Sequence, residues 1–248
     1  MNRTKLHQEI AEKAKADGIS ILPNLLSEDE LEAVRADFEQ FYEDQGRLPQ
    51  EPGTRIGIET DSLIDYPSIA MLFAQPDILA IVKAILEEPR PFLRTIKTNR
   101  YTPEHSGVDK HTDCIEEELS PPHQIQSVAV FLDDIRVESG ALTYVPGSHR
   151  RYYESEDNPD GTLPSKKDIE AGDYIPAELN AGSVLFRVPE VWHAVNPIHH
   201  LRRYITFNYL IRLSLAPKLQ ETCDQAVESR KQSEQTIRSR ALQEMWLL

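Results

Sequence analysis

The sequence predicts a mainly β fold with helical cover: a double-stranded β-helix, or jelly roll, of the cupin-like kind. From about residue 91 the chain consists of short runs rich in β-branched and aromatic residues, a spacing typical of a jelly roll rather than of βαβ units. The first 90 residues show helical periodicity instead. We therefore expect one domain over 1–248, with a helical N-terminal cover at 1–90, a jelly-roll core at 91–216 and a C-terminal helical tail at 217–248.

Local signals place the elements of the N-terminal cover. Three segments with apolar residues on one face are expected as helices: 4–16, 27–44 and 77–88. Ser27 and Glu30 form a capping-box pattern at the start of the second of these. The apolar run 19–22 should be an edge strand, whereas 46–66 is rich in Gly, Pro and charge and is expected to be loop.

The predicted core strands lie in five runs: FLRTIKTNRY, QSVAVFLDD, ALTYV, SVLFRV and RRYITFNYLIRL. A polar insertion, 151–174, separates two of them and is long for a loop in a compact domain. Insertions of this kind often act as lids or bind substrate. We expect this one to close over a polar ligand and to govern substrate choice.

Charge and composition narrow the class of partner. The net charge of −14 would repel a phosphate backbone, so nucleic acid is not expected as a partner. A small neutral or cationic substrate is favoured over a bulky polyanion. No stretch is expected to span a membrane, and Cys114 and Cys223 are too few for a disulfide framework. We expect a cytoplasmic protein, whose C-terminal tail packs on the core or at a subunit contact of a homo-oligomer.

His111 and Asp113 form the main chemical pattern. They lie two residues apart, so in an extended segment both side chains point to the same side. His193, 80 residues beyond Asp113, is a candidate third ligand because distant strands meet in a jelly roll. Two imidazoles and one carboxylate on one face of an octahedral metal are the arrangement of non-haem Fe(II) oxygenases. A His-x-Asp pattern alone is weak evidence, since eight histidines make a chance occurrence common.

Four longer motifs resemble those of the phytanoyl-CoA dioxygenase family. They are, in order, DGISILPNLLSEDELEAV, RYTPEHSGVDKHTD, FLDDIRVESGALTYVPGSHR and WHAVNPIHHLRRY, and together they cover nearly the whole chain. Gly140 and the Pro-Gly-Ser-His turn at 146–149 are the most distinctive part. The resemblance implies an enzyme that uses Fe(II), 2-oxoglutarate and O2 to hydroxylate, or otherwise oxidise, a small metabolite. Succinate and CO2 would be the products of 2-oxoglutarate.

The resemblance also implies the iron ligands, which would be His111, Asp113 and His193. Halogenases of the family have Ala or Gly where the carboxylate ligand would be, so Asp113 disfavours halogenation. Desaturation, ring closure and epoxidation are alternatives to hydroxylation that the sequence does not exclude.

Two adjacent arginines are candidates for binding the distal carboxylate of 2-oxoglutarate. In the family this arginine usually lies six residues after an asparagine, and Asn196 then indicates Arg202. Strand alternation favours the same choice, because Arg202 shares a face with polar residues and Arg203 with apolar ones. Its planar guanidinium can bind a carboxylate with two parallel hydrogen bonds.

Other polar residues near these motifs have weaker claims. Asn99 and Tyr101 share a face before the metal motif and either contact 2-oxoglutarate or fill the barrel; Gln126 is a similar case. His149 is expected to be structural. Four further histidines in polar segments are expected to be solvated: His105, His123, His199 and His200. The acidic run 116–118 is expected to be a solvated loop.

Two other function classes fit part of the pattern. A non-redox metal-binding jelly roll that senses or stores a ligand would keep the histidines but would have no need of Arg202. A cupin-like isomerase or hydrolase would use a different divalent metal, and 2-oxoglutarate would be irrelevant to it. Binding of 2-oxoglutarate, and its conversion to succinate, separate both from the oxygenase.

Overall fold

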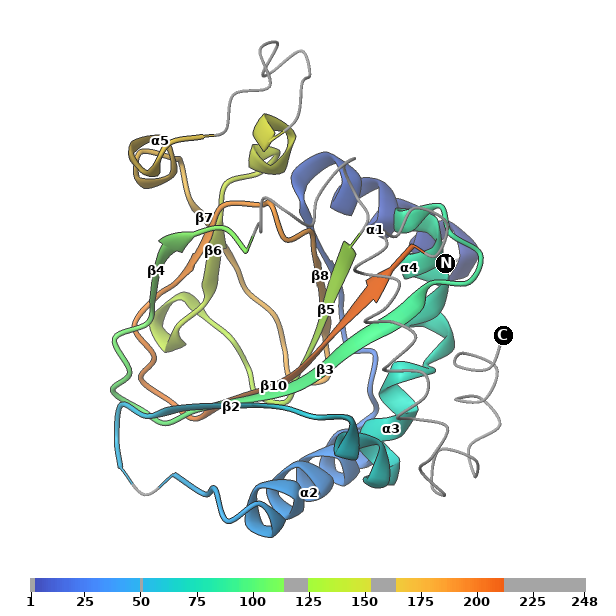
Figure 1. Cartoon of the computed structure of the whole chain (residues 1–248), viewed down its shortest axis with the longest axis vertical. Coiled ribbons are helices and arrows are strands. Elements are labelled where there is room, and N and C mark those ends of the chain that lie inside the picture. Colours follow the sequence, from blue (N-terminus) through green and yellow to red (C-terminus); the bar gives the residue numbers. More distant parts are fainter. Residues whose placement is uncertain (1–2, 50, 114–124, 153–163, 212–248) are drawn as a thin grey trace.

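Two antiparallel sheets face each other in the computed structural model, which describes residues 3–49, 51–113, 125–152 and 164–211 (Figure 1). The larger sheet has the strand order β1-β8-β5-β10-β3-β2 and the smaller sheet the order β4-β9-β6-β7. The larger contains β1 (Ile19–Leu22), β2 (Arg55–Glu59), β3 (Phe92–Tyr101), β5 (Ile125–Phe131), β8 (Val184–Arg187) and β10 (Arg202–Leu210). The smaller contains β4 (Val108–His111), β6 (Leu142–Tyr144), β7 (Ile175–Ala177) and β9 (His193–Val195). This is the predicted jelly-roll architecture.

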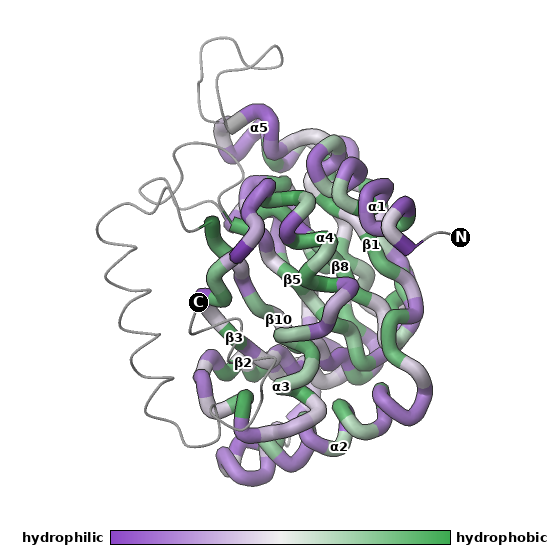
Figure 2. The backbone as a smooth tube through the Cα atoms, turned by 90° about the vertical axis from the view of Figure 1, so that its right-hand side faces the viewer, coloured by the Kyte–Doolittle hydropathy of each residue, from purple (hydrophilic) through white to green (hydrophobic). Residues whose placement is uncertain are grey.

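Helices from the N-terminal part of the chain cover the outer face of the larger sheet. They are α1 (Arg3–Asp17), α2 (Glu28–Asp44), α3 (Pro67–Phe73) and α4 (Pro76–Leu86), whereas α5 (Lys166–Glu170) lies against β4. Three short 3-10 helices complete the list: η1 (Asp61–Asp65), η2 (Val137–Ser139) and η3 (Ser148–Tyr152). Figure 2 shows mostly polar residues along α1 and α2 and mostly apolar residues in the strands beneath. The predicted helical cover is thus confirmed.

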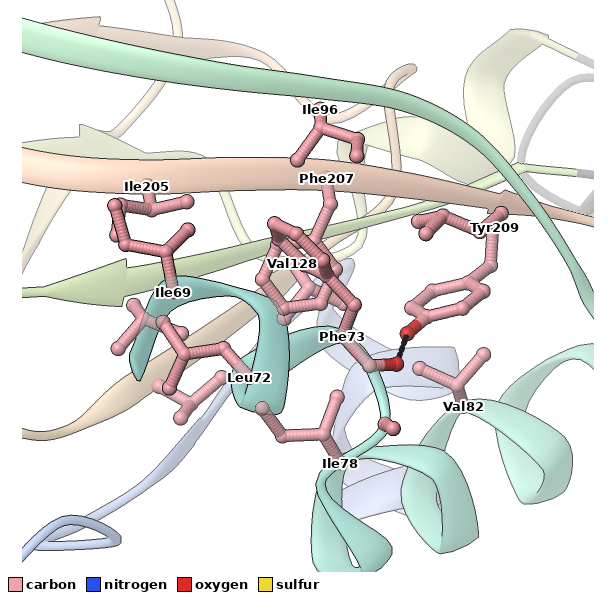
Figure 3. Close-up of a cluster of buried hydrophobic side chains, with 14 of the residues drawn as sticks. Ile69, Leu72, Phe73, Ile78, Val82, Ile96, Val128, Ile205, Phe207 and Tyr209 are labelled. Atoms are coloured by element: carbon pink, nitrogen blue, oxygen red, sulfur yellow. Dashed lines mark hydrogen bonds between the residues drawn. The ribbon is translucent and has the colours of Figure 1, made fainter. Parts of the chain in front are cut away.

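The main hydrophobic core lies between these helices and the larger sheet. Phe73 of α3 packs edge-on against Phe207 of β10, with ring centroids 5.1 Å apart (Figure 3). The hydroxyl of Tyr209 donates to the carbonyl oxygen of Phe73 over 2.5 Å. Fully burying a side chain of this size stabilises the fold by roughly 1.5–3 kcal/mol. Because Ile205, Phe207 and Tyr209 all face the helices, the alternate residues of β10 face the second sheet.

Local signals explain where the helices begin. The Ser27 hydroxyl accepts from the Glu30 backbone N–H at 3.4 Å, and the Glu30 carboxylate accepts from the Ser27 N–H at 2.8 Å, which is the predicted capping box. Pro67 and Pro76 stand in the first turns of α3 and α4, where a missing N–H costs no hydrogen bond. The strand at 19–22 is also confirmed, at one edge of the larger sheet.

The segment Pro67–Leu86 departs from the expectation that no stretch is apolar enough to span a membrane. By length and composition this 20-residue segment passes that test, with a mean hydropathy of 1.8. In the structure it is the two helices α3 and α4, separated by Ala74 and Gln75, and 61% of its most apolar 18-residue stretch is buried. This segment is therefore part of the helical cover of the larger sheet.

The prediction that 46–66 is loop was wrong. The segment contains β2 and η1, and β2 pairs antiparallel with β3 so that Gly57 lies opposite Asn99. Ile56 and Ile58 pack against the core, whereas the alternate residues of β2 face away from it. A strand with one polar face and a central glycine has the composition of a loop, which is why the sequence concealed it. The segment 1–90 therefore supplies both edge strands of the larger sheet besides its helices.

Several expectations fall on parts of the chain outside the described residues. These are the C-terminal helical tail at 217–248, the acidic run 116–118, His123, both cysteines and the central part, 153–163, of the insertion 151–174.

Candidate functional site

His111 and His193 lie opposite each other in the smaller sheet. Strand β4 ends at His111 and β9 begins at His193, and the two residues are register partners with ring centroids 4.2 Å apart. His111 Nδ1 lies 2.7 Å from the carbonyl oxygen of Asp109, and His193 Nδ1 lies 2.9 Å from that of Val191. A carbonyl only accepts, so these contacts favour a proton on each Nδ1 and leave the lone pair of a neutral ring on Nε2.

Asp113 completes the group. Its backbone N–H donates to the carbonyl oxygen of Pro189 at 3.0 Å, and the Thr112 hydroxyl donates to the same oxygen at 3.2 Å. These contacts hold the segment after β4 against the chain that leads into β9. Asp113 Oδ1 lies 3.4 Å from His111 Nε2 and 3.9 Å from His193 Nε2. The three candidate ligand atoms all lie within 4.8 Å of one another, a spacing suited to a single metal ion.

Arg187, at the end of β8, was not singled out in the sequence. Its Nη2 donates to Asp113 Oδ2, the carboxylate oxygen that faces away from the histidines, and its Nη1 lies 3.3 Å from His193 Nδ1. One oxygen of Asp113 is thus held by an arginine while the other faces the centre. The signal that could have found Arg187 is alternation, because Leu185 and Arg187 share the inner face of the run SVLFRV.

The charges of the three residues follow from this arrangement. Partial burial would raise the pKa of Asp113, but the charge of Arg187 and the hydrogen bond with His111 hold it far below its usual range. Burial, reinforced by Arg187, lowers the pKa of His193 to about 3. The hydrogen bond with Asp113 raises the pKa of His111. Near neutral pH the group therefore offers a carboxylate and a neutral buried imidazole.

A cavity of about 640 Å³ lies between the two sheets, and the three residues line it together with Arg202. The guanidinium carbon of Arg202 lies 5.3–5.7 Å from the ring centroids of Tyr101, Phe131 and Tyr204. Its Nη1 donates to the carbonyl oxygen of Gly140 at 2.7 Å. Gly140 has a φ of 93°, which a residue with a side chain rarely adopts.

Arg202 is a buried cation for which the described part of the chain supplies no counter-charge. It is 2% exposed, its Nε has no hydrogen-bond partner, and no carboxylate pairs with it among the described residues. Burial is the main cause that lowers its pKa. An unpaired buried charge is costly unless a ligand of opposite charge compensates it.

Arg203 faces the opposite side of β10. Its Nη2 lies 2.7 Å from Asp133 Oδ1 and its Nη1 lies 2.8 Å from Glu39 Oε1 of α2. Hydrogen bonds with Asp133 and Glu39 outweigh burial and raise the pKa of Arg203. Arg202 is therefore the one of the two arginines that lines the cavity.

The comparison with known families agrees with the motifs. The sequence model of the phytanoyl-CoA dioxygenase (PhyH) family matches residues 14–199, which include all three clustered residues. The chain belongs to this family. A search of curated proteins gave no significant match.

Solved structures with the same fold include iron- and 2-oxoglutarate-dependent enzymes. The non-heme alpha ketoglutarate dependent carbocyclase SnoK, from nogalamycin biosynthesis, matches with a TM-score of 0.65 and 22% identity over 82% of this chain and 83% of its own. The epimerase SnoN, in complex with Fe3+, alpha ketoglutarate and nogalamycin RO, matches with 0.67 and 18% over 84% of each chain. HygX from Streptomyces hygroscopicus, with nickel and 2-oxoglutarate bound, matches with 0.62 and 17% over 86% and 93%. At these identities the likeness establishes the fold.

Asn99 and Tyr101 line the cavity of this PhyH-family protein, beside Arg202. Tyr101 stacks on Tyr204 with centroids 6.2 Å apart. The amide of Asn99 donates to the Thr206 hydroxyl at 3.4 Å. Gln126 instead donates to the backbone carbonyls of Ser127 and Arg187 and does not line the cavity.

The remaining described histidines lie outside the cluster. His149 is buried and its Nε2 lies 3.0 Å from the carbonyl oxygen of Lys15, as suits a structural residue. His199 and His200 are exposed. His105 is partly buried, and its ring packs edge-on against the Tyr101 ring with centroids 4.9 Å apart. The expectation that His105 is solvated was therefore wrong.

Proposed function

We propose that this protein is a non-haem Fe(II)- and 2-oxoglutarate-dependent dioxygenase that hydroxylates an unactivated C–H bond of a small metabolite. His111, Asp113 and His193 would hold the iron, and Arg202 would bind the distal carboxylate of 2-oxoglutarate. When bound, iron and 2-oxoglutarate supply the oxidising power, converting O2 and the 2-oxo acid to succinate and CO2 while the substrate is oxidised.

The buried, unpaired guanidinium of Arg202 is the observation that carries this proposal. It lines the same cavity as the His-Asp-His cluster, and it has a free Nε and no carboxylate partner among the described residues. A dicarboxylate that bridges a metal and an arginine satisfies both features at once. A metal-binding sensor, an isomerase or a hydrolase would need the cluster alone.

The donor set fits Fe(II). Two imidazole Nε2 atoms and one carboxylate oxygen are the ligands of facial iron sites, which leave positions open for a chelating co-substrate and O2. Backbone acceptors fix both imidazole rings in the metal-binding tautomer, and Arg187 orients the carboxylate. His111 Nε2 and Asp113 Oδ1, 3.4 Å apart, both face the position that a cation would take.

The residues around the cluster would bind and shield the reactants. Tyr101, Phe131 and Tyr204 surround the Arg202 guanidinium with aromatic rings, which excludes water and strengthens a charge-assisted bond to a carboxylate. Asn99 and Tyr101 line the same part of the cavity and would contact 2-oxoglutarate.

Anaerobic binding of 2-oxoglutarate to the Fe(II)-loaded protein tests the proposal without the unknown substrate. We expect saturable binding that requires both the metal and Arg202. Admission of O2 should then yield succinate, even if slowly. A protein that binds metal but not 2-oxoglutarate would contradict the proposal and favour a non-redox sensor or isomerase. Mass analysis of the product formed from a substrate would separate hydroxylation from ring closure or epimerisation.

A further inference from the structure

The cavity carries an excess of positive charge although the chain as a whole is strongly acidic. Five arginine or lysine side chains line it, against the two carboxylates Glu59 and Asp113, while the net charge of the chain is −14. In the proposed function Arg202 is assigned to 2-oxoglutarate, and Arg187 is paired with Asp113. Arg55 of β2 and Lys97 of β3, which also line the cavity, then have no role in the proposed function.

Lys97 has an acidic neighbour that it does not use. Glu59 is its register partner across the β2–β3 pair, and both side chains line the cavity. Opposite charges in such positions attract each other and can form an ion pair. Among the described residues, however, no ion pair joins Lys97 to Glu59 or to any other carboxylate.

Gly57 explains the course of the Lys97 side chain. A Cβ built on Gly57 would lie 2.9 Å from Lys97 Cε and 3.7 Å from Lys97 Nζ. The absence of a side chain at this position therefore lets the lysine lie across β2. The end of its side chain lies beside Gly57, and within the described residues its ammonium group forms no ion pair with Glu59.

Arg55 approaches the same place from the other side. Its Nη2 donates to Asn99 Oδ1 at 3.4 Å, and that oxygen lies 3.3 Å from the Cβ position of Gly57. Its guanidinium stacks over the ring of Tyr101 at 5.3 Å, and no carboxylate pairs with it among the described residues. Lys97 and the Asn99 amide oxygen that Arg55 contacts thus both lie beside Gly57, and two cations at one place repel each other in the absence of an anion.

We propose that Arg55 and Lys97 form a second anion-binding subsite, which holds an anionic oxygen group of the substrate, a carboxylate or a phosphate. The subsite lies toward the cavity mouth, because exposure falls from Arg55 on the edge strand, through half-buried Lys97, to Asn99 and Arg202 inside. The substrate class is then a small anionic metabolite, contrary to the neutral or cationic class that the net charge favoured. This proposal rests on the proposed function for the assignment of Arg202 to 2-oxoglutarate.

Matched probes test the subsite by binding alone. The full-length protein is loaded anaerobically with Fe(II) and saturating 2-oxoglutarate, and benzoate, phenyl phosphate and benzamide are titrated by calorimetry. We expect at least one anion to bind about tenfold tighter than benzamide, its neutral counterpart, because only the anion gains the two charges. The tighter of the two anions identifies the group as carboxylate or phosphate.

Variants assign the effect to residues. Lys97→Gln and Arg55→Gln should each weaken anion binding about fivefold or more, and Gly57→Ala should weaken it by displacing Lys97. Lys83→Gln, which removes an exposed lysine of α4, is the charge-matched control and should change nothing. The affinity for 2-oxoglutarate should stay within about twofold in Lys97→Gln, since Arg202 is intact.

Three results would overturn the subsite. They are equal binding of anions and benzamide, unchanged anion binding in both Lys97→Gln and Arg55→Gln, or anion binding that is lost only with Arg202. Failure of the proposed function looks different, because 2-oxoglutarate itself would then not bind. In that case the same titrations without 2-oxoglutarate still report on Arg55 and Lys97.

Discussion

His111 and His193 are register partners across the β4–β9 pair, and both direct Nε2 toward the same oxygen of Asp113. The backbone pairing fixes the separation of the two rings, and the carbonyls of Asp109 and Val191 fix their orientation. The protein alone thus positions the three candidate ligand atoms, which would lower the entropic cost of binding a metal ion there.

Replacing His193 with Ala should therefore lower Fe(II) affinity by more than about 100-fold, since loss of a ligand exceeds the 10–100-fold effect of losing an outer partner. His111→Ala and Asp113→Ala should act in the same direction. Anaerobic calorimetry with Fe(II) measures this directly. His199→Ala, at an exposed histidine, is the control. Full activity and full metal affinity in His193→Ala would mean that the third ligand lies elsewhere, with His199 or His200 next to be tested.

Arg202→Ala should weaken 2-oxoglutarate binding by roughly 2–4 kcal/mol, the size of a charge-assisted bidentate contact in a dry site. Arg202→Lys should recover part of this, because the charge returns without the planar fork. Arg203→Ala should leave the affinity for 2-oxoglutarate unchanged and lower thermal stability instead, since its partners are Asp133 and Glu39. If only Arg203→Ala is impaired in 2-oxoglutarate binding, the assignment must move by one residue.

Arg187→Met should lower Fe(II) affinity by about 10–100-fold, as expected for a residue that orients a ligand without being one. The variant keeps an unbranched apolar stem but removes the guanidinium that holds Asp113 Oδ2. Two affinities of the variant are measured: that for Fe(II), and that for 2-oxoglutarate at saturating Fe(II). If Arg187 only orients Asp113, the first should fall and the second should not. An effect on 2-oxoglutarate alone would place Arg187 in the co-substrate site.

Glu39 connects α2 to two strands of the larger sheet, and its effect should depend on pH. Burial would raise its pKa, but hydrogen bonds from Arg100 and Arg203 outweigh this and lower it. A lowered folded-state pKa means that the stabilisation is fully present above the ordinary value of 4.5 and is lost as the pH falls through the folded-state value.

Glu39→Gln should therefore reduce the free energy of unfolding by about 1–2 kcal/mol at pH 7, discounted for partial exposure. The difference from wild type should shrink in urea titrations below about pH 4.5. Glu32→Gln is the control on the same helix. The Glu32–Arg35 ion pair is more exposed than the pairs of Glu39, so its loss should cost less stability. If the stability difference between wild type and Glu39→Gln grew as the pH fell, the stabilisation could not come from the charged Glu39 carboxylate.

The insertion 151–174 should govern the coupling of 2-oxoglutarate turnover to product formation. Its described part includes α5, whose Glu170 carbonyl accepts from Lys110 of β4 at 2.7 Å, one residue from His111. Replacing 153–163 with a short Gly-Ser linker should lower the ratio of product to succinate while iron binding is kept. Unchanged coupling and unchanged substrate preference would leave the insertion as surface decoration.

Alternation along β10 was the feature that the sequence predicted best. Its apolar residues Ile205, Phe207 and Tyr209 face the helices, as their spacing indicated, and Arg202 lines the cavity. The same rule applied to β8 would have identified Arg187. Periodicity is local, so it survives without knowledge of the tertiary fold.

The convergence of His193 with His111 could not be derived from spacing. It depends on the pairing of two short strands, β4 and β9, and β9 was not predicted as a strand. The resemblance to a family supplied what local patterns lacked. Strand β2 was missed for a related reason, since residues that line a polar cavity mimic the composition of a solvent-exposed loop.

The division of β10 into two faces restricts how this strand can change over generations. Arg202 lines the cavity, and the next residue, Arg203, contacts the helical cover. Substitutions can therefore change one face of the strand without changing the other. Insertion or deletion of a single residue has no such freedom, because it exchanges the faces of every residue beyond it. The lineage of this protein should therefore tolerate substitutions on one face of β10 at a time, Arg202 and Tyr204 excepted, and almost no change in the length of the strand.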